Sequence, residues 1–241
     1  MKIVNWNWHY KQNINKYLEI IKYNPQILII QECTKNDFDY IKSQWLYKNW
    51  YNDDLNNENS LLGVAIFSNE FKIEFSDLFN RKFRYVIPYV VKRDDFEFYI
   101  FSVWIKPYEK DYVKGIEKYL YASKEYYKDM LDKNAIFIGD FNIYAKEDNG
   151  RLKILEDKFK PMINCTQDTC FRNAFTYYDS RFGYGIDDFC FISQDIKNKY
   201  ELEINVPNEW DDKKEKKYRW KGLSDHSPII INFKEKMNNL A

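Results

Sequence analysis

Histidine is scarce in this sequence of 241 residues, which has only His9 and His226, and its four cysteines form no Cys-x-x-Cys pair. A zinc site built from histidine and cysteine is therefore disfavoured, because such sites need several of these ligands at short spacings. An excess of either charge is also missing, since 37 lysines and arginines balance 37 aspartates and glutamates. The chain as a whole thus lacks the basic signature of a nucleic-acid-binding protein, although a neutral total is compatible with a local basic face.

Long apolar runs are absent too. No apolar segment approaches the length needed to span a bilayer, so we expect no membrane partner. Met1 runs directly into the apolar Ile3 and Val4 without the regions of a signal peptide, which favours a reduced, cytoplasmic protein. The length and the lack of a linker rich in glycine, proline or serine predict a single domain over residues 1–241. Nothing in the sequence indicates an obligate protein partner.

Helical and extended patterns alternate along the chain. Residues 13–24 and 112–131 carry apolar side chains at helical spacing, whereas the short all-apolar runs 27–30 and 135–138 are typical of strands buried on both faces. Further strands are expected at 63–68, 85–91, 96–104, 186–192 and 228–233. The alternation predicts an α/β fold in which packed mixed β-sheets are flanked by helices.

Polar residues interrupt or follow these buried strands. They are Asn7, Gln31-Glu32, Gly139 to Asn142, Asp187-Asp188 and Ser224 to Pro228. Ligand sites in open α/β sheets collect beyond the strand ends, and several carboxylates buried there would be costly without a counter-charge. A hard divalent cation, Mg²⁺ or Mn²⁺, supplies that charge with few protein ligands and leaves room for a phosphate. The pattern therefore favours phosphoryl chemistry.

Taken in order, five short motifs resemble those of the endonuclease/exonuclease/phosphatase superfamily, which includes DNase I and the exonuclease III-type enzymes. The motifs are Trp6-Asn7, Gln31-Glu32, Gly139-Asp140-Phe141-Asn142, Ile186-Asp187 and Ser224-Asp225-His226-Ser227-Pro228. The resemblance covers essentially the whole chain. It implies a four-layer α/β sandwich, two packed mixed β-sheets flanked by helices, and metal-dependent hydrolysis of a phosphodiester by in-line attack of water.

The resemblance also implies roles for residues at the metal and the water. Glu32 would hold the metal, with Asn7 and Asp225 near enough to ligate it or its waters. Asp140 would orient and deprotonate the attacking water, and Asn142 would hold a phosphate oxygen.

The same resemblance makes His226 the imidazole that contacts the scissile phosphate. Asp187 would fix its tautomer. Asp188, which stands where the family usually has an aromatic residue, is interpreted as structural or supporting. Because the chain has only two histidines, the paired-histidine arrangement of DNase I is absent, and the pattern is closer to the exonuclease III type.

Trp104 stands where the family usually has a catalytic histidine or tyrosine. Its indole donates a hydrogen bond but exchanges no proton at neutral pH, so it is a candidate substrate contact, and packing is the plainer interpretation. Arg84 closes the basic run 81–84, which could grip a phosphate backbone or simply face solvent. The basic stretch 213–221 leaves the same two interpretations open, a solvated loop being favoured.

Three functions stay open at this point. The first is a metal-dependent DNA endonuclease or exonuclease, with DNA as its nucleic-acid substrate. The second is a phosphatase or phosphodiesterase for a small-molecule or lipid phosphoester, which would need an enclosed pocket instead of an open basic groove. The third is an inactive binding module on the same scaffold, which the complete set of polar residues disfavours.

Overall fold

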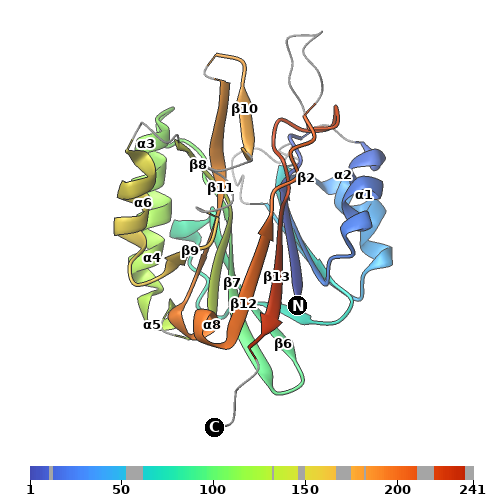
Figure 1. Ribbon diagram of the computed structural model, residues 1–241, viewed down its shortest axis with the longest axis horizontal. Coiled ribbons are helices and arrows are strands. Elements are labelled where there is room, and N and C mark those ends of the chain that lie inside the picture. Colours follow the sequence, from blue (N-terminus) through green and yellow to red (C-terminus); the bar gives the residue numbers. More distant parts are fainter. Residues whose placement is uncertain are drawn as a thin grey trace.

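The computed structural model describes residues 1–10, 13–52, 62–131, 133–145, 150–166, 175–181, 183–210 and 220–236. Two β-sheets pack face to face, and helices cover the outer face of each (Figure 1). The four-layer α/β sandwich expected from the sequence is confirmed. The segments 53–61, 167–174 and 211–219 lie outside the described residues, and the last of them includes most of the basic stretch 213–221.

The first sheet has six strands in the order β12-β13-β1-β2-β4-β3. Their bounds are β12 Tyr200–Asn205, β13 Ile229–Glu235, β1 Lys2–Asn7, β2 Ile27–Thr34, β4 Leu62–Ser68 and β3 Tyr47–Tyr51. β1 and β2 are parallel, and the other neighbours are antiparallel. Helices α1 (Ile14–Ile20) and α2 (Lys35–Ile41) cover this sheet, each continued by one 3₁₀ turn, η1 (Ile21–Tyr23) and η2 (Lys42–Gln44) (Figure 1).

The second sheet runs β10-β11-β8-β7-β6-β5, with β9 paired to β11. The bounds are β10 Tyr177–Asp179, β11 Gly183–Ile192, β8 Ala135–Ala145, β7 Phe96–Trp104, β6 Val86–Arg93, β5 Lys72–Phe75 and β9 Ile163–Asn164. Helices α3 (Tyr112–Gly115), α4 (Ala122–Tyr126), α5 (Lys128–Leu131) and α6 (Arg151–Phe159) lie on its outer face (Figure 1). The 3₁₀ turn η3 (Arg81–Phe83) precedes β6, and α8 (Gln194–Lys199) joins β11 to β12.

Strand β2 shows why the sheets need cover on both faces. Ile27 and Ile29 belong to the core between the two sheets, whereas Leu28 and Ile30 pack with residues of α1 and α2. All four side chains are fully buried. Since successive residues of a strand point to opposite faces, an uninterrupted apolar run is what a strand between two layers requires. The expectation of a doubly buried strand at 27–30 is confirmed, and the strand continues to Thr34.

The helix expected over residues 112–131 is present but broken. Residues Ile116–Tyr121 form a π-helical segment, η4, between α3 and α4, and Tyr127 leaves helical geometry before α5 begins. The wider π turn carries both Tyr119 and Leu120 into the core. Apolar spacing alone predicts an unbroken helix there because it cannot reveal one extra residue per turn.

Gly139 is the backbone position on which the site most depends. Its φ is +145°, and a Cβ at this position would overlap the backbone carbonyl of Val103 on the neighbouring strand β7. We expect Gly139→Ala to lower the free energy of unfolding by about 2–4 kcal/mol, since it combines backbone strain with overpacking. Gly150→Ala is the matched control, because a Cβ there meets nothing within 4 Å and only its φ of +65° is strained. Urea unfolding of both variants measures the difference, and equal losses would contradict the account.

Candidate active site

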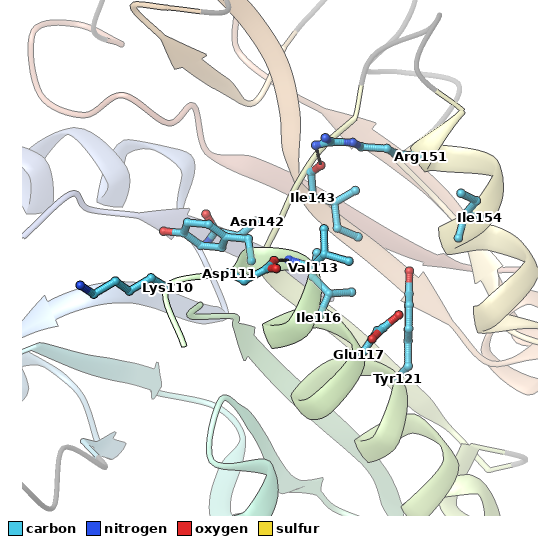
Figure 2. A pocket seen from close by; sticks show the side chains of 11 residues that line it. Lys110, Asp111, Val113, Ile116, Glu117, Tyr121, Asn142, Ile143, Arg151 and Ile154 are labelled. Atoms are coloured by element: carbon cyan, nitrogen blue, oxygen red, sulfur yellow. Dashed lines mark hydrogen bonds between the residues drawn. The ribbon is translucent and has the colours of Figure 1, made fainter. Parts of the chain in front are cut away.

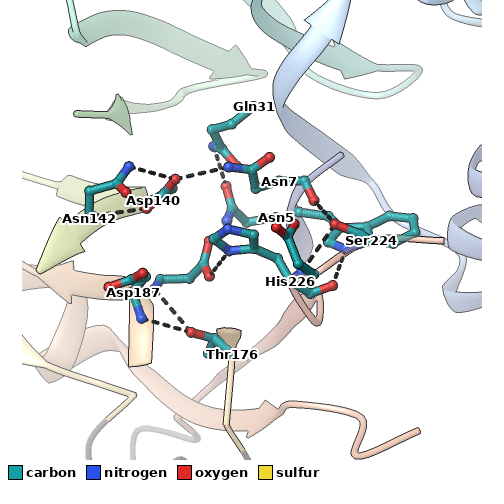
Figure 3. Close-up of polar contacts among 12 residues, drawn as sticks. Asn5, Asn7, Gln31, Asp140, Asn142, Thr176, Asp187, Ser224 and His226 are labelled. Carbon is teal, nitrogen blue, oxygen red and sulfur yellow. Dashed lines mark hydrogen bonds and ion pairs between the residues drawn. The ribbon is translucent and has the colours of Figure 1, made fainter. Parts of the chain in front are cut away.

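Asp140 lies at the centre of the candidate site, where β8 of the second sheet meets β1 of the first (Figure 3). Its side chain is buried, and its carboxylate accepts three hydrogen bonds. The amides of Asn7 and Asn142 both donate to Oδ2 at 2.9 Å, and the backbone N–H of Asn142 donates to Oδ1 at 2.9 Å. The structure therefore brings these three predicted residues together from two sheets.

Glu32 joins the same group through Asn7, whose amide nitrogen lies 3.3 Å from Oε1 of Glu32. The pairing of β2 with β4 slips between Ile30 and Cys33, and Glu32 has a φ of +53°. Such a bulge turns a side chain out of the regular alternation, and bulges recur beside active sites. The residue that the sequence places at the end of a strand is thus an irregular position within β2.

His226 pairs with Asp188, not with Asp187 as the sequence predicts. Nδ1 of His226 lies 2.7 Å from Oδ2 of Asp188, and both side chains are buried. The cause is a slip in the pairing of β11 with β8 between Ile186 and Asp188, after which Asp188 stands opposite Asp140. The extra residue at the bulge reverses which of the two aspartates faces the site.

Asp187 has a different position from the one expected. Its Oδ1 accepts the backbone N–H of Tyr144 on β8, and the hydroxyl of Thr176 accepts the backbone N–H groups of both Asp187 and Asp188. These contacts fix the bulge in place. Asp187 therefore holds the backbone beside the site, and its pairing with the imidazole of His226 is corrected to Asp188.

The segment before β13 is tied to β1. The hydroxyl of Ser224 donates to the carbonyl of Asn7 and accepts the backbone N–H of His226, and the indole of Trp6 donates to the carbonyl of His226. Asp225 turns the other way, with Oδ2 2.7 Å from Nδ1 of His9. These hydrogen bonds fix the end of β1 and the turn at Ser224 in position relative to each other.

The surroundings of the buried Asp140 and His226 side chains shift the pKa values of both groups. Burial raises the pKa of the Asp140 carboxyl well above its usual value; His226 opposes this shift, while Asp188, Asp187 and Glu32 add to it. Burial alone would lower the pKa of the His226 imidazole, but the charge and hydrogen bond of Asp188 raise it well above its usual value. The acids repel one another, and a positive charge on the imidazole of His226 would partly offset this repulsion.

The donor set fits a hard divalent cation. Glu32 offers a carboxylate, and two buried carboxylate oxygens, Oδ1 of Asp188 and Oδ1 of Asp225, have no hydrogen-bond partner among the described residues. The amide oxygen of Asn7 accepts the backbone N–H of His9, and its nitrogen donates to Glu32 and Asp140, so Asn7 orients the two carboxylates. No group of three or more histidine, cysteine, aspartate or glutamate side chains in the described part of the chain is placed to hold a metal. Mg²⁺ commonly uses only one or two carboxylates and fills its shell with water and phosphate, so a sparse set is compatible with it.

Comparison with known proteins gives a likeness in structure alone. No family model matches the sequence, and the search of curated proteins finds no match. The 3′ phosphatase NExo from Neisseria, solved with a product DNA hairpin, is 18% identical with a TM-score of 0.69, and the match covers 97% of this chain and 99% of that one. TDP2 from D. rerio, complexed with a single-strand DNA product, is 14% identical with a TM-score of 0.69 and coverages of 97% and 98%.

A third match is the endonuclease domain of TRAS1, a telomere-specific non-LTR retrotransposon. It is 18% identical with a TM-score of 0.64, and 97% of each chain is covered. Matches of this extent decide the fold. This chain has the four-layer fold of these structures, the DNase I-like fold.

Within the DNase I-like fold, Trp104 lies beside β8, the strand that carries Asp140. It is the last residue of β7, is paired in register with Asp140, and is mostly buried. The ammonium group of Lys106 stands 4.0 Å from the centre of its indole ring. Trp104 therefore packs in the hydrophobic core, as the plainer interpretation of the sequence has it, with a cation next to its ring.

Arg84 lies at the same edge of the second sheet, just before β6, but outside the central group. Its guanidinium lies over the rings of Tyr85 and Tyr119, at 5.2 and 5.9 Å from their centres. Together with Arg81, Lys82, Phe83, Lys118 and Tyr119 it lines a separate pocket of about 410 Å³.

Sequence reasoning missed several residues of this site. Tyr177 packs its ring against His226, with ring centres 4.7 Å apart, and His9 is the partner of Asp225. Tyr112 lies near enough that the charges of Asp140 and Glu32, after burial, raise the pKa of its phenol. Tyrosine is so frequent here, with 21 in the chain, that no single one carries a signal in the sequence.

The described part of the chain contains no helix long and apolar enough to cross a membrane.

Proposed function

We propose that this protein is a divalent-metal-dependent phosphodiester hydrolase that acts on nucleic acid as a DNA endonuclease or exonuclease. The observation that carries the proposal is the group at the sheet junction: a buried Asp140 fixed by Asn7 and Asn142, beside the His226–Asp188 pair. Acid, amide and imidazole side chains in one buried group are the components that in-line hydrolysis of a phosphoester needs.

Asp140 is the proposed base. Its raised pKa makes the carboxylate a better proton acceptor than an exposed aspartate, and two asparagine amides hold it in one orientation. Asn142 has a φ of +52°, a region that asparagine tolerates better than most residues, and its amide is placed beside the carboxylate oxygen. The pair would position the attacking water and a phosphate oxygen together.

His226 is the proposed stabiliser of developing negative charge. Asp188 holds Nδ1, which leaves Nε2 as the ring nitrogen available to the phosphate. The raised pKa keeps the imidazole protonated, so the ring presents a donor and a positive charge. A preorganised donor of this kind needs no reorganisation as charge develops.

Glu32 is the proposed metal-holding residue, and the amide of Asn7, which donates to it, would keep its carboxylate in place. Asp225, whose Oδ1 has no hydrogen-bond partner among the described residues, is the second candidate ligand. A bound Mg²⁺ or Mn²⁺ would offset the acidic group and the charge on the phosphoryl oxygens.

Support for nucleic acid as the substrate comes from two sides. The structural matches include proteins solved with a DNA hairpin product and a single-strand DNA product. On this chain, Lys106 over Trp104 and the basic pocket of Arg81, Lys82 and Arg84 place cations along the edge of the sheet that carries the site. Trp104 and Arg84 are thus the proposed substrate contacts.

The test is cleavage of plasmid, single-stranded and abasic oligonucleotides in Mg²⁺. Cleavage of any of them supports the proposal. Hydrolysis of a small phosphoester such as bis(p-nitrophenyl) phosphate, with all oligonucleotides intact, would replace it with the phosphatase or small-molecule phosphodiesterase alternative.

Removing the metal should abolish turnover. We expect excess chelator to stop cleavage and added Mg²⁺ or Mn²⁺ to restore it, because the acidic group then loses its counter-charge. The same ions should raise the melting temperature of the wild-type protein, since a ligand that binds only the folded state stabilises it. Glu32→Gln should show a much smaller rise. A metal-independent activity, or an equal rise in both proteins, would contradict the assignment of Glu32.

A further inference from the structure

A second pocket opens next to Asn142, on the helical side of the second sheet (Figure 2). It has a volume of about 620 Å³ and lies between the α3–η4 segment and α6. Its inner wall is the strand of the candidate active site, through Asn142 and Ile143 of β8. No role described so far uses this pocket.

The pocket borders the candidate active site at Asn142. This residue lines the pocket, and its amide donates to Asp140 at 2.9 Å and to the carbonyl of Ile105 at 2.8 Å. Tyr112 lines the same pocket, and burial together with the charges of Asp140 and Glu32 raises the pKa of its phenol. A group bonded to a phosphate held at Asn142 therefore reaches the pocket without a long linker.

The lining suits a flat ring with polar edges. Val113 and Ile154 face the pocket from opposite helices, and they are 59% and 56% exposed (Figure 2). Exposed apolar side chains gathered in a concave site mark a ligand surface. The carboxylate of Glu117 also lines the pocket, and a carboxylate accepts hydrogen bonds from exocyclic amines of bases.

The charged residues of the lining are also compatible with a ring that has polar edges. Lys110 and Arg151 line opposite parts of the pocket, and the guanidinium of Arg151 donates to the carbonyl of Ile143 at 2.8 Å (Figure 2). Together with the acids Asp111 and Glu117, these two cations give the lining no net charge, which suits an uncharged ring with polar edges better than a free anion.

We propose that this pocket holds the nucleobase of a nucleotide that flanks the scissile phosphate. The inference rests on the proposed nucleic-acid hydrolase function and adds to it a place where the base next to the cut is bound. It makes the enzyme sensitive to the presence of a base beside the bond, and not only to the phosphodiester itself.

The test compares two oligonucleotides of one sequence, one with a normal base and one with a tetrahydrofuran abasic residue beside a defined scissile bond, placed in turn on its 5′ and 3′ side. Ile154→Asp should lower kcat/KM on the base-bearing substrate by about tenfold, as expected when the contacts of one base are lost. The abasic substrate should be cleaved at the wild-type rate, which also shows that the variant folds. Val113→Asp should behave alike.

Leu18→Asp is the matched control. Leu18 is 50% exposed on α1, on the opposite side of the sandwich, and its replacement should change neither rate (Figure 1). Equal losses on both substrates with Ile154→Asp, or no loss on either, would overturn the pocket assignment.

A wild-type protein that cleaves neither substrate contradicts the proposed function instead. The pocket is then judged by calorimetric titration with a deoxynucleoside 5′-monophosphate and with deoxyribose 5-phosphate. Tighter binding of the nucleotide that Ile154→Asp removes supports the pocket, and equal affinities for the two ligands overturn it.

Discussion

Asp140→Asn lowers kcat for phosphodiester cleavage by about a thousandfold or more, because it removes the proposed base from the centre of the site. The change keeps the size of the side chain, so the packing of β8 against β1 is preserved. In the wild-type protein, three N–H groups of Asn7 and Asn142 donate to the carboxylate of Asp140. The side-chain nitrogen of the new asparagine cannot accept a hydrogen bond, so it would face at least one of these donors unfavourably. The measurement is the initial rate of cleavage at saturating substrate and Mg²⁺.

Asp39→Asn is the control for this variant. Asp39 is an exposed aspartate on α2, where it pairs with Lys35 and Lys42, and its replacement should leave kcat unchanged. Circular dichroism of both variants checks that the fold is retained. A folded Asp140→Asn protein with wild-type kcat would remove Asp140 from the catalytic group.

Asp188→Asn should lower kcat by about a hundred- to ten-thousandfold, whereas Asp187→Asn should cost less than about tenfold. Asp188 holds the imidazole of His226, and an amide there favours the wrong tautomer. Asp187 accepts the backbone N–H of Tyr144 and makes no hydrogen bond with the imidazole of His226 among the described residues, and the carbonyl oxygen of an asparagine can also accept the Tyr144 N–H. The two neighbouring changes are chemically identical, so each is the control for the other.

Nuclear magnetic resonance separates this account from a merely structural effect. Because the chain has two histidines, the imidazole signals of His9 and His226 are readily distinguished. The pKa of His226 should fall in Asp188→Asn, since the charge that raises it is gone, and should change less in Asp187→Asn. The reverse order in the rates or in the pKa would restore Asp187 as the partner of the imidazole.

The layers of the fold could be predicted from the sequence because burial leaves a direct mark on it. The runs 27–30 and 135–138 are apolar at every position, which a strand between two layers requires. Short or half-exposed strands leave no such mark. β3, β5, β10 and β12 were not expected for this reason, and each is at least partly exposed.

The site was predictable in its composition but not in its pairing. The polar residues at 7, 32, 140, 142 and 226 stand out because each interrupts a buried strand or precedes one. Choosing between Asp187 and Asp188 requires the register of β11 on β8, and one bulge reverses the choice. The apolar pattern on either side of the two aspartates is the same for both alternatives.

The contacts that helices make beside the site could not be predicted from the sequence either. Tyr112 lies near the acidic group because α3 packs beside β8, and Ile154 lines the neighbouring pocket from α6. Spacing along the chain does not encode such neighbours, and a high aromatic content hides them further.

The central claim is that this group of residues directs water onto a phosphodiester. Its most direct test is a mass measurement on the phosphate-bearing product, formed from a single-stranded oligonucleotide by the wild-type protein with Mg²⁺ in water enriched in heavy oxygen. The account predicts that the heavy atom enters the new phosphate group at each cleaved bond, and that Asp140→Asn forms almost no product. Cleavage that leaves the product phosphate unlabelled, or full labelling at the wild-type rate by Asp140→Asn, would contradict it.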